Sequence, residues 1–596
     1  MDFFGHQEAA RRRTKWLVFY FAAAIACIIA ALHAAFCAFA GQQWDNWELL
    51  GATAAGVLAV VAVGSLVKIA ELAKGGRAVA EMLGGAPVNT ATRNPSERRL
   101  LNVVEEMAIA SGMAVPQVYV LDDAAINAFA AGYGARDAVV GVTRGCMEQL
   151  TRDELQGVVA HEFSHILNGD MRLNIRLIGL LNGILFLAVV GGVLMRIAAH
   201  SRGGRSRNDK GGGSIVMVVI AAGLALYLVG WIGVFFGKLI KAAVSRQREF
   251  LADASAVQFT RDPNGIAGAL EKIGGVGSRI ASPRAQEASH MFFGNGLAES
   301  WFQLFATHPP IPERVSRIRG IQAAAVQAAG KNPPPLPAAA DAAAGASLLA
   351  GIPAPAQESA RDLFGACGVV YGLLLSNEES IRKNQLRSLQ ADEALKRESE
   401  KSAKETAALG SGKKIALVEL VVPTLRGLSP QQAAVFRSNI EALVAADGRI
   451  HLFEYALQKM LLRHLADFFG TKRRGGPKVR SLVPLLPDVG FVLSAVANAE
   501  DGGTPARDRS FAAGAAALGS AKPAYPLERL ANVDLREFDA ALERLDGAVD
   551  SVKSRVLEAC EAAAMADGKV NGIQFELVRA ISDTLGFPMP PAVETA

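Results

Sequence analysis

Two histidines and a glutamate stand close together in the sequence His161-Glu162-Phe163-Ser164-His165. On a helix, residues four positions apart share a face, so both imidazoles can bind one metal ion. A catalytic zinc site has three protein ligands and keeps a position for water, and Glu162 lies where it can take that water's proton. The pattern predicts a metal-dependent hydrolase. The alternative is a pair of histidines that are exposed or satisfied within a core.

A third ligand is expected near residues 248–253, where Glu249 and Asp253 are again four positions apart. Glu249 can complete a two-histidine, one-glutamate zinc set. Asp253 can accept a hydrogen bond from a ligand imidazole and fix its tautomer. Taken alone, two acids at this spacing favour a solvated helix face. Together with the two histidines, they favour a site for one Zn²⁺ ion.

The predicted elements around these residues are helices and short strands. Thr151 and Glu154 form a capping box that starts the helix with the two histidines. An amphipathic helix is predicted from residue 94 to 112, and β-rich runs cover 116–121 and 138–142. We therefore expect a mostly α-helical α+β domain with a small β-sheet.

Hydrophobic residues make up 51% of the 596 residues, and their excess is concentrated before residue 238. Four runs there contain no Asp, Glu, Lys or Arg, and they cover residues 16–44, 49–67, 177–195 and 211–237. A bilayer core requires about 20 apolar residues in a helix, so each run is a predicted membrane segment. The first run exceeds the apolar core of about 7–15 residues in a signal peptide, so we expect a retained anchor.

Basic residues flank the first two runs. They are Arg11, Arg12, Arg13 and Lys15 before the first run, and Lys68, Lys74 and Arg77 after the second. The connection 41–48 contains no Lys or Arg. Because cytoplasmic loops are enriched in Lys and Arg, residues 1–75 are predicted to form a membrane hairpin with both ends in the cytoplasm.

The connection between the third and fourth runs is also basic, and a simple hairpin would place its charges outside. The two runs either cross the membrane fully or re-enter it without crossing. Both arrangements keep His161, His165 and Glu249 on one side. The basic loop 201–213 is either a solvated linker or a contact for anionic headgroups.

Four blocks occur in a specific order and spacing. They are Asn127-Ala128-Phe129-Ala130 with Gly132, His161 to His165 with Asn168-Gly169-Asp170, Glu249-Phe250-Leu251-Ala252-Asp253, and Thr307-His308-Pro309-Pro310 with Arg314. With these blocks, residues 40–320 resemble the membrane zinc peptidases of the HtpX and CAAX prenyl protease type. The resemblance implies a multi-pass membrane domain with a gluzincin-like peptidase fold.

Further site residues follow from this resemblance. It implies that Asn127, Ala128 and Phe129 lie on an edge strand that pairs with the substrate backbone. It also implies that His308 faces the oxyanion and that Arg314 supports the site. On the residues alone, Asn127 and Phe129 could equally be strand and core residues. The prolines after His308 favour a turn ahead of a helix.

The expected function is that of a membrane-embedded zinc endopeptidase at the cytoplasmic surface of a bacterial-type inner membrane. The resemblance implies membrane-protein quality control, with protein or peptide substrates, above all membrane proteins, and the lipid bilayer as partners. The net charge of +5 is too balanced for a nucleic-acid binder. The alternative is a non-catalytic membrane adaptor or sensor that binds through its C-terminal domain. The intact ligand set with Glu162 argues against it.

The chain divides by composition. We predict a membrane hairpin over 1–75, a peptidase domain over 76–330 that contains segments 177–195 and 211–237, a Pro/Ala-rich linker over 331–360, and an all-α domain over 361–596. The five cysteines are scattered, which fits a reducing compartment.

The C-terminal domain contains two similar stretches, 445–450 and 565–570, each with Ala-Asp-Gly between apolar helices. Asp-Gly supplies the left-handed residue that ends a helix, so each stretch is predicted to be a helix-turn-helix. The calcium-ligand ladder of an EF-hand is missing. The pattern resembles TerB-like helical domains, although Gln574 stands where Glu454 stands in the first stretch. This resemblance implies a fold more than a function.

Overall fold

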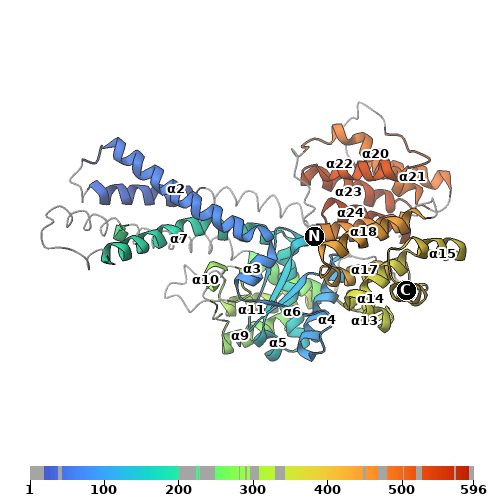
Figure 1. Cartoon of the computed structure of the whole chain (residues 1–596), viewed down its shortest axis with the longest axis horizontal. Coiled ribbons are helices and arrows are strands. Elements are labelled where there is room, and N and C mark those ends of the chain that lie inside the picture. The colour runs from blue at the N-terminus through green and yellow to red at the C-terminus, as the bar shows by residue number, and fades with distance from the viewer. Residues whose placement is uncertain are drawn as a thin grey trace. The chain divides into compact units, whose positions relative to one another are not determined.

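The structure is a computed structural model that forms two compact units (Figure 1). It describes residues 19, 21–37, 43–200, 223–225, 227, 248–278, 280, 282, 284–288, 291–294, 308–328, 342–446, 452–466, 479–500, 503–518, 527–568 and 572–589. The first unit comprises residues 1–87, 118–257 and 262–332, and the second comprises 88–117, 258–261 and 333–596.

The described residues are mostly helical with a small sheet, as predicted, and this sheet has four strands. The strands are β1 (Ala86–Pro87), β2 (Gln117–Leu121), β3 (Ala128–Ala131) and β4 (Val139–Thr143), in the spatial order β1-β2-β4-β3. β3 pairs antiparallel with β4, with Ala128 opposite Val142 and Ala131 opposite Val139. β3 is therefore an edge strand of this sheet.

The helix with the two histidines is α6 (Arg152–Leu167), and its predicted capping box is confirmed. Thr151 Oγ1 accepts from the Glu154 N–H at 3.3 Å, and Glu154 Oε2 accepts from the Thr151 N–H at 2.7 Å. α6 packs closely on α9 (Pro263–Val276). A Cβ atom at Gly157 would lie 2.6 Å from the backbone nitrogen of Ile266, so the glycine allows this approach. This close contact holds α6 against the interior of the unit.

Two helices of the first unit are long and apolar enough to cross a membrane, at residues 47–74 and 170–197. They correspond to α2 (Trp47–Glu71) and α7 (Asp170–His200) and to the second and third predicted runs. The first run contains a shorter apolar helix, Phe21–Cys37. The fourth run lies almost wholly outside the described residues. Within the described residues, two of the four predicted runs are candidate spans.

α2 and α7 lie side by side (Figure 1) and run antiparallel. Glycines allow the close approach, since a Cβ atom at Gly183 would lie 2.4 Å from the Val61 carbonyl oxygen. Near the C-terminal end of α2, Ile69 lies against Gly179. The end of α2 therefore lies beside the beginning of α7.

The remaining elements of the first unit are short, apart from α11. They are η1 (Leu72–Lys74), α3 (Gly76–Met82), η2 (Ala135–Asp137), α5 (Arg144–Gln149), α10 (Ala285–Ala288) and α11 (Ile311–Ala328). Residues 248–260 are also helical. This helix and α6 carry the predicted metal ligands.

The second unit is mostly helical within the described residues. It contains α4 (Pro95–Ser111), α12 (Ala342–Ala350), α13 (Ala354–Arg361), α14 (Leu363–Leu374), α15 (Glu379–Ser388), α16 (Glu393–Thr406), α17 (Ser411–Leu425), α18 (Pro430–Ala445), α19 (Leu452–Ala466), η5 (Val483–Leu485), α20 (Leu486–Asn498), α21 (Thr504–Ala517), α22 (Leu535–Asp546), α23 (Asp550–Ala564) and α24 (Gly572–Leu585). The helix predicted at 94–112 is thus present as α4, within the second unit.

α4 is tied to the C-terminal helices by close contacts. Arg361 Nη2 lies 2.5 Å from Glu105 Oε2, and both side chains are largely buried. A Cβ atom at Gly345 of α12 would lie 2.2 Å from the Glu106 carbonyl oxygen. Residues 342–361, most of them in the predicted linker, form α12 and α13. The predicted domain boundaries themselves stay a prediction.

The second Ala-Asp-Gly stretch joins α23 to α24, and Gly568 has a φ of +74°. This is the left-handed residue expected between the two helices. Residues 447–450 of the first stretch lie outside the described residues. The resemblance to TerB-like domains stays a prediction.

Candidate metal centre

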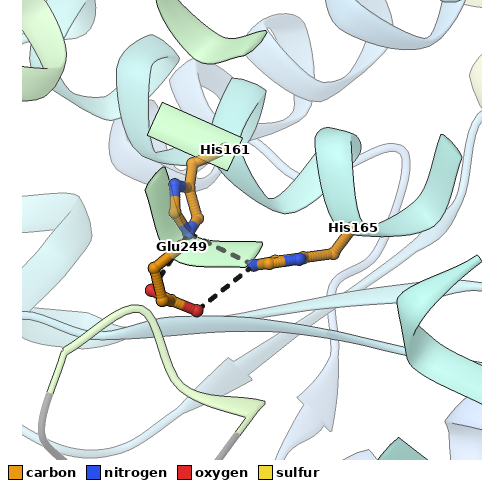
Figure 2. Close-up of side chains that lie close together, drawn as sticks. All are labelled: His161, His165 and Glu249. Carbon is orange, nitrogen blue, oxygen red and sulfur yellow. Dashed lines mark hydrogen bonds and ion pairs between the residues drawn. The ribbon is translucent and has the colours of Figure 1, made fainter. Parts of the chain in front are cut away.

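The predicted ligands His161, His165 and Glu249 converge on one point (Figure 2). The two Nε2 atoms lie 3.2 Å apart. Glu249 Oε2 lies 3.7 Å from His161 Nε2, and Glu249 Oε1 lies 3.7 Å from His165 Nε2. The three ligand atoms all lie within 4.8 Å of one another, as one shared cation requires.

His161 is oriented by a carboxylate and an arginine. Its Nδ1 atom lies 3.0 Å from Asp253 Oδ1, one helical turn after Glu249. Arg314 of α11 donates from Nε to Asp253 Oδ2 at 2.8 Å and from Nη2 to Asp253 Oδ1 at 2.6 Å. This bidentate contact fixes the orientation of the Asp253 carboxylate. Because that carboxylate contacts Nδ1 of His161, the Nε2 atom faces the ligand cluster.

His308 lies beside the third ligand. Its Nδ1 atom is 2.8 Å from Glu249 Oε2, and the side chain is 3% exposed. Two prolines separate His308 from the start of α11 at Ile311. The turn that the sequence predicts ahead of this helix is therefore present. The same turn holds the imidazole at the site. Its Nε2 atom has no hydrogen-bond partner among the described residues.

Glu162 is buried next to the ligands, and its side-chain oxygens have no side-chain hydrogen-bond partner within the described parts of the chain. Burial raises the pKa of Glu162 to about 8, and the positive charges of His165 and Arg314 oppose the shift. A carboxyl group with a pKa near neutrality can both accept and return a proton. Glu162 is thus suited to act as a general base and acid.

The protonation of two of the three candidate ligands, His161 and Glu249, fits a divalent cation. Burial lowers the pKa of His161 to about 4 despite the opposing effect of Asp253. Burial alone would raise the pKa of Glu249, but His308 and Arg314 hold it well below its usual range. Neutral imidazole and ionised carboxylate are the forms that bind a metal. The pKa of His165 is raised to about 9 by Asp170 and Glu249, against its burial, so a proton competes with the metal there.

The predicted substrate residues lie on or beside the edge strand β3, and their pairing with a substrate stays a prediction. The side chain of Asn127 contacts other segments of the chain. It donates to the Ser278 carbonyl oxygen at 2.7 Å and accepts from the Gly294 N–H at 3.2 Å. Phe129 is 1% exposed, and a Cβ atom at Gly141 would lie 2.2 Å from its ring. Asn127 therefore holds neighbouring chain segments, and Phe129 packs in the core.

The outer edge of β3 carries a short segment of the same chain, residues 291–294. The Phe293 N–H donates to the Ala128 carbonyl oxygen at 2.8 Å, and Phe292 forms an antiparallel bridge with Phe129. The Phe293 ring lies 4.9 Å from the His161 ring, and Arg314 Nη1 donates to the Phe293 carbonyl oxygen at 2.9 Å. This segment was not predicted, and an isolated bridge has no periodic sequence signal.

Asp170 and Arg248 were also not assigned a role from the sequence. Asp170 Oδ2 lies 3.1 Å from His165 Nδ1, and Arg248 Nη1 lies 3.1 Å from Asp170 Oδ1. Asp170 belongs to one of the four blocks, and Arg248 directly precedes Glu249. The sequence signal for Asp170 and Arg248 was their position within or next to the blocks that carry the family resemblance.

Comparison with known proteins agrees with this site. The sequence family described as peptidase family M48 matches residues 94–322. A protein named protease HtpX homolog from Thermoanaerobacter pseudethanolicus is 40% identical over 240 residues, which cover 40% of this chain and 76% of the relative. The protein of that name from Ligilactobacillus salivarius is 35% identical over 274 residues, 46% of this chain and 88% of the relative. No solved structure matches.

The fold and the family match define a metallopeptidase, and the two histidines with the glutamate are its candidate metal ligands. The chain belongs to peptidase family M48 and to its HtpX group. The match ends at residue 322, so helices α12 to α24 lie beyond it.

Proposed function

We propose that this chain is a membrane-embedded, zinc-dependent endopeptidase that acts at the cytoplasmic surface in membrane-protein quality control. The observation that carries the proposal is the convergence of His161, His165 and Glu249 beside the buried Glu162. A scaffold protein has no need for this combination, since buried unpaired carboxylate oxygens are costly. Family membership supports the protease activity.

The residues would divide the chemistry as follows. Zn²⁺ held by His161, His165 and Glu249 would polarise the peptide carbonyl and lower the pKa of a water. Glu162 takes a proton from the attacking water and gives it to the leaving amine as the C–N bond breaks. His308, through Nε2, donates a hydrogen bond to the negative charge that develops on the carbonyl oxygen. Asp253 and Arg314 hold His161 in place.

The membrane location is supported by the surfaces of the two long helices. Exposed apolar side chains lie on both, such as Leu66 on α2 and Val189 on α7, which are 65% and 53% exposed. Trp44 and Trp47 are 70% and 77% exposed at the start of α2, where aromatic residues mark a membrane interface. Two exposed apolar helices packed as a pair suit a bilayer.

The antiparallel packing of α2 and α7 supports a cytoplasmic orientation of the metal centre. The end of α2 carries Lys68, and Lys74 and Arg77 follow it. This basic end lies beside the beginning of α7, which starts directly after the histidine helix α6. Since Lys and Arg are enriched on the cytoplasmic side, the metal centre is assigned to that side.

The activity is tested with the full-length protein in detergent micelles and a fluorogenic, unstructured peptide. Cleavage is expected to stop after dialysis against a chelator and to return when zinc is added. A chain that acts only as an adaptor would leave the peptide intact before and after zinc is added, and this result would reject the proposed function.

A substrate that pairs with β3 has to reach an edge that residues 291–294 partly cover, so we expect this segment to move aside during catalysis. Opposite residues of an antiparallel pair have Cα atoms about 4.5–5.5 Å apart, which suits a disulfide. The double variant Phe129→Cys/Phe292→Cys is expected to lose cleavage when oxidised and to regain it with dithiothreitol. The reduced protein and the single variant Phe292→Cys are the controls. Equal rates in the cross-linked and reduced forms would show that substrate does not need this edge.

A further inference from the structure

A sharp turn between α6 and α7 brings Asp170 into contact with His165. α6 ends at Leu167, Asn168 caps it, and Gly169 has a φ of +71°, a conformation that favours glycine. α7 then starts at Asp170, five residues after His165. The turn brings the first residue of α7 back against the last turn of α6, where Asp170 Oδ2 lies 3.1 Å from His165 Nδ1.

The other oxygen of Asp170 faces an arginine from a distant part of the chain. Arg248 Nη1 lies 3.1 Å from Asp170 Oδ1, and the two side chains are 10% and 9% exposed. Arg248 directly precedes the ligand Glu249 on the helix of residues 248–260. The ion pair therefore joins the start of a predicted membrane helix to the element that carries the third ligand.

The two histidines have equivalent surroundings. His161 contacts Asp253, which contacts Arg314, and His165 contacts Asp170, which contacts Arg248. In each case a carboxylate meets Nδ1 and leaves Nε2 facing the ligand cluster. An arginine on the far side of each carboxylate fixes its orientation.

We propose that Asp170 and Arg248 are positioning residues for the metal centre. Asp170 fixes the tautomer and ring orientation of His165 and increases the basicity of Nε2. Arg248 holds Asp170 in place and ties the start of α7 to the helix of Glu249. The inference rests on the proposed metal site, because it states how this chain holds one of that site's ligands.

The test measures zinc affinity of the full-length protein by chelator competition, together with thermal unfolding of the zinc-free form. Asp170→Ala removes the acceptor and is expected to weaken zinc binding about 10- to 100-fold, and Asp170→Asn, which keeps an acceptor but loses the charge, to weaken it less. Arg248→Gln is expected to have a smaller effect than Asp170→Ala, because the contact between Asp170 and His165 remains.

The matched controls are Asp122→Asn and Arg144→Gln, which remove an ion pair whose side chains are 86% and 45% exposed. Both are expected to bind zinc as the unaltered protein does. If an unpaired Arg248 prevents folding of the single variants, Asp170→Asn/Arg248→Gln removes both buried charges. This double variant is expected to melt close to the unaltered zinc-free protein and still to bind zinc more weakly.

Zinc affinity of Asp170→Ala within twofold of the controls would overturn the inference. A double variant with unaltered zinc affinity would also overturn it. An unaltered protein that binds no zinc at all would instead reject the proposed function, so the two failures are distinguishable.

Discussion

Replacing Glu162 by Gln is expected to abolish peptide cleavage while leaving the metal bound. Gln has the same shape but cannot accept the proton of the attacking water, and removal of a general base costs about 10²–10⁴-fold in rate. Glu162 is not among the proposed ligands, His161, His165 and Glu249, so zinc content is expected to stay the same. The measurement is the cleavage rate of a fluorogenic peptide alongside elemental analysis of the same sample.

The matched control is Asp153→Asn, a change of the same kind at a 70% exposed side chain of the same helix. It is expected to leave the rate unchanged. Cleavage by Glu162→Gln at the rate of this control would contradict the role given to Glu162.

Replacing Arg314 by Met is expected to destabilise the protein by about 3–5 kcal/mol. Arg314 is 1% exposed and lies between two buried carboxylates, those of Asp253 and Glu249. Its loss leaves both negative charges without their guanidinium partner and removes the hydrogen bond to the Phe293 carbonyl oxygen. The free energy of unfolding, obtained from chemical denaturation in detergent, measures the effect.

Two further variants separate the charge from the loss of packing. Arg319→Met removes an arginine that is 59% exposed on the same helix and is expected to change stability by at most about 1 kcal/mol. The double variant Arg314→Met/Asp253→Asn also removes the negative charge of Asp253. It is expected to recover part of the lost free energy of unfolding. If Arg314→Met is no less stable than Arg319→Met, the buried ion pairs do not stabilise the site.

The residues of the candidate metal centre could be predicted because helical periodicity relates sequence to space directly. His161 and His165 share a face of α6 by their spacing, and Glu249 and Asp253 repeat that relation on a second helix. The spacing alone does not indicate that residue 249 lies near residue 161. The prediction that the two helices meet depended on the known zinc-ligand set and on the family resemblance. The small sheet and the mostly helical fold followed from the same local patterns.

Other features could not be predicted because they depend on packing between distant segments. The contact of Phe292 with β3 is an isolated bridge, and the pairing of Asp170 with Arg248 joins residues on either side of two apolar runs. Likewise, α4 reads as an ordinary amphipathic helix, and its sequence does not indicate that Glu105 pairs with Arg361. Local periodicity determines which face of an element is apolar, but not which partner covers it.

The most direct test of the metal centre is the zinc content per chain of the unaltered protein and of Glu249→Ala, both purified under identical conditions. We expect about one zinc ion per chain in the unaltered protein and a large loss in Glu249→Ala, because two histidines alone leave the set of three ligands incomplete. Absence of zinc from the unaltered protein, or equal zinc in both, would contradict the assignment of His161, His165 and Glu249 as the metal ligands.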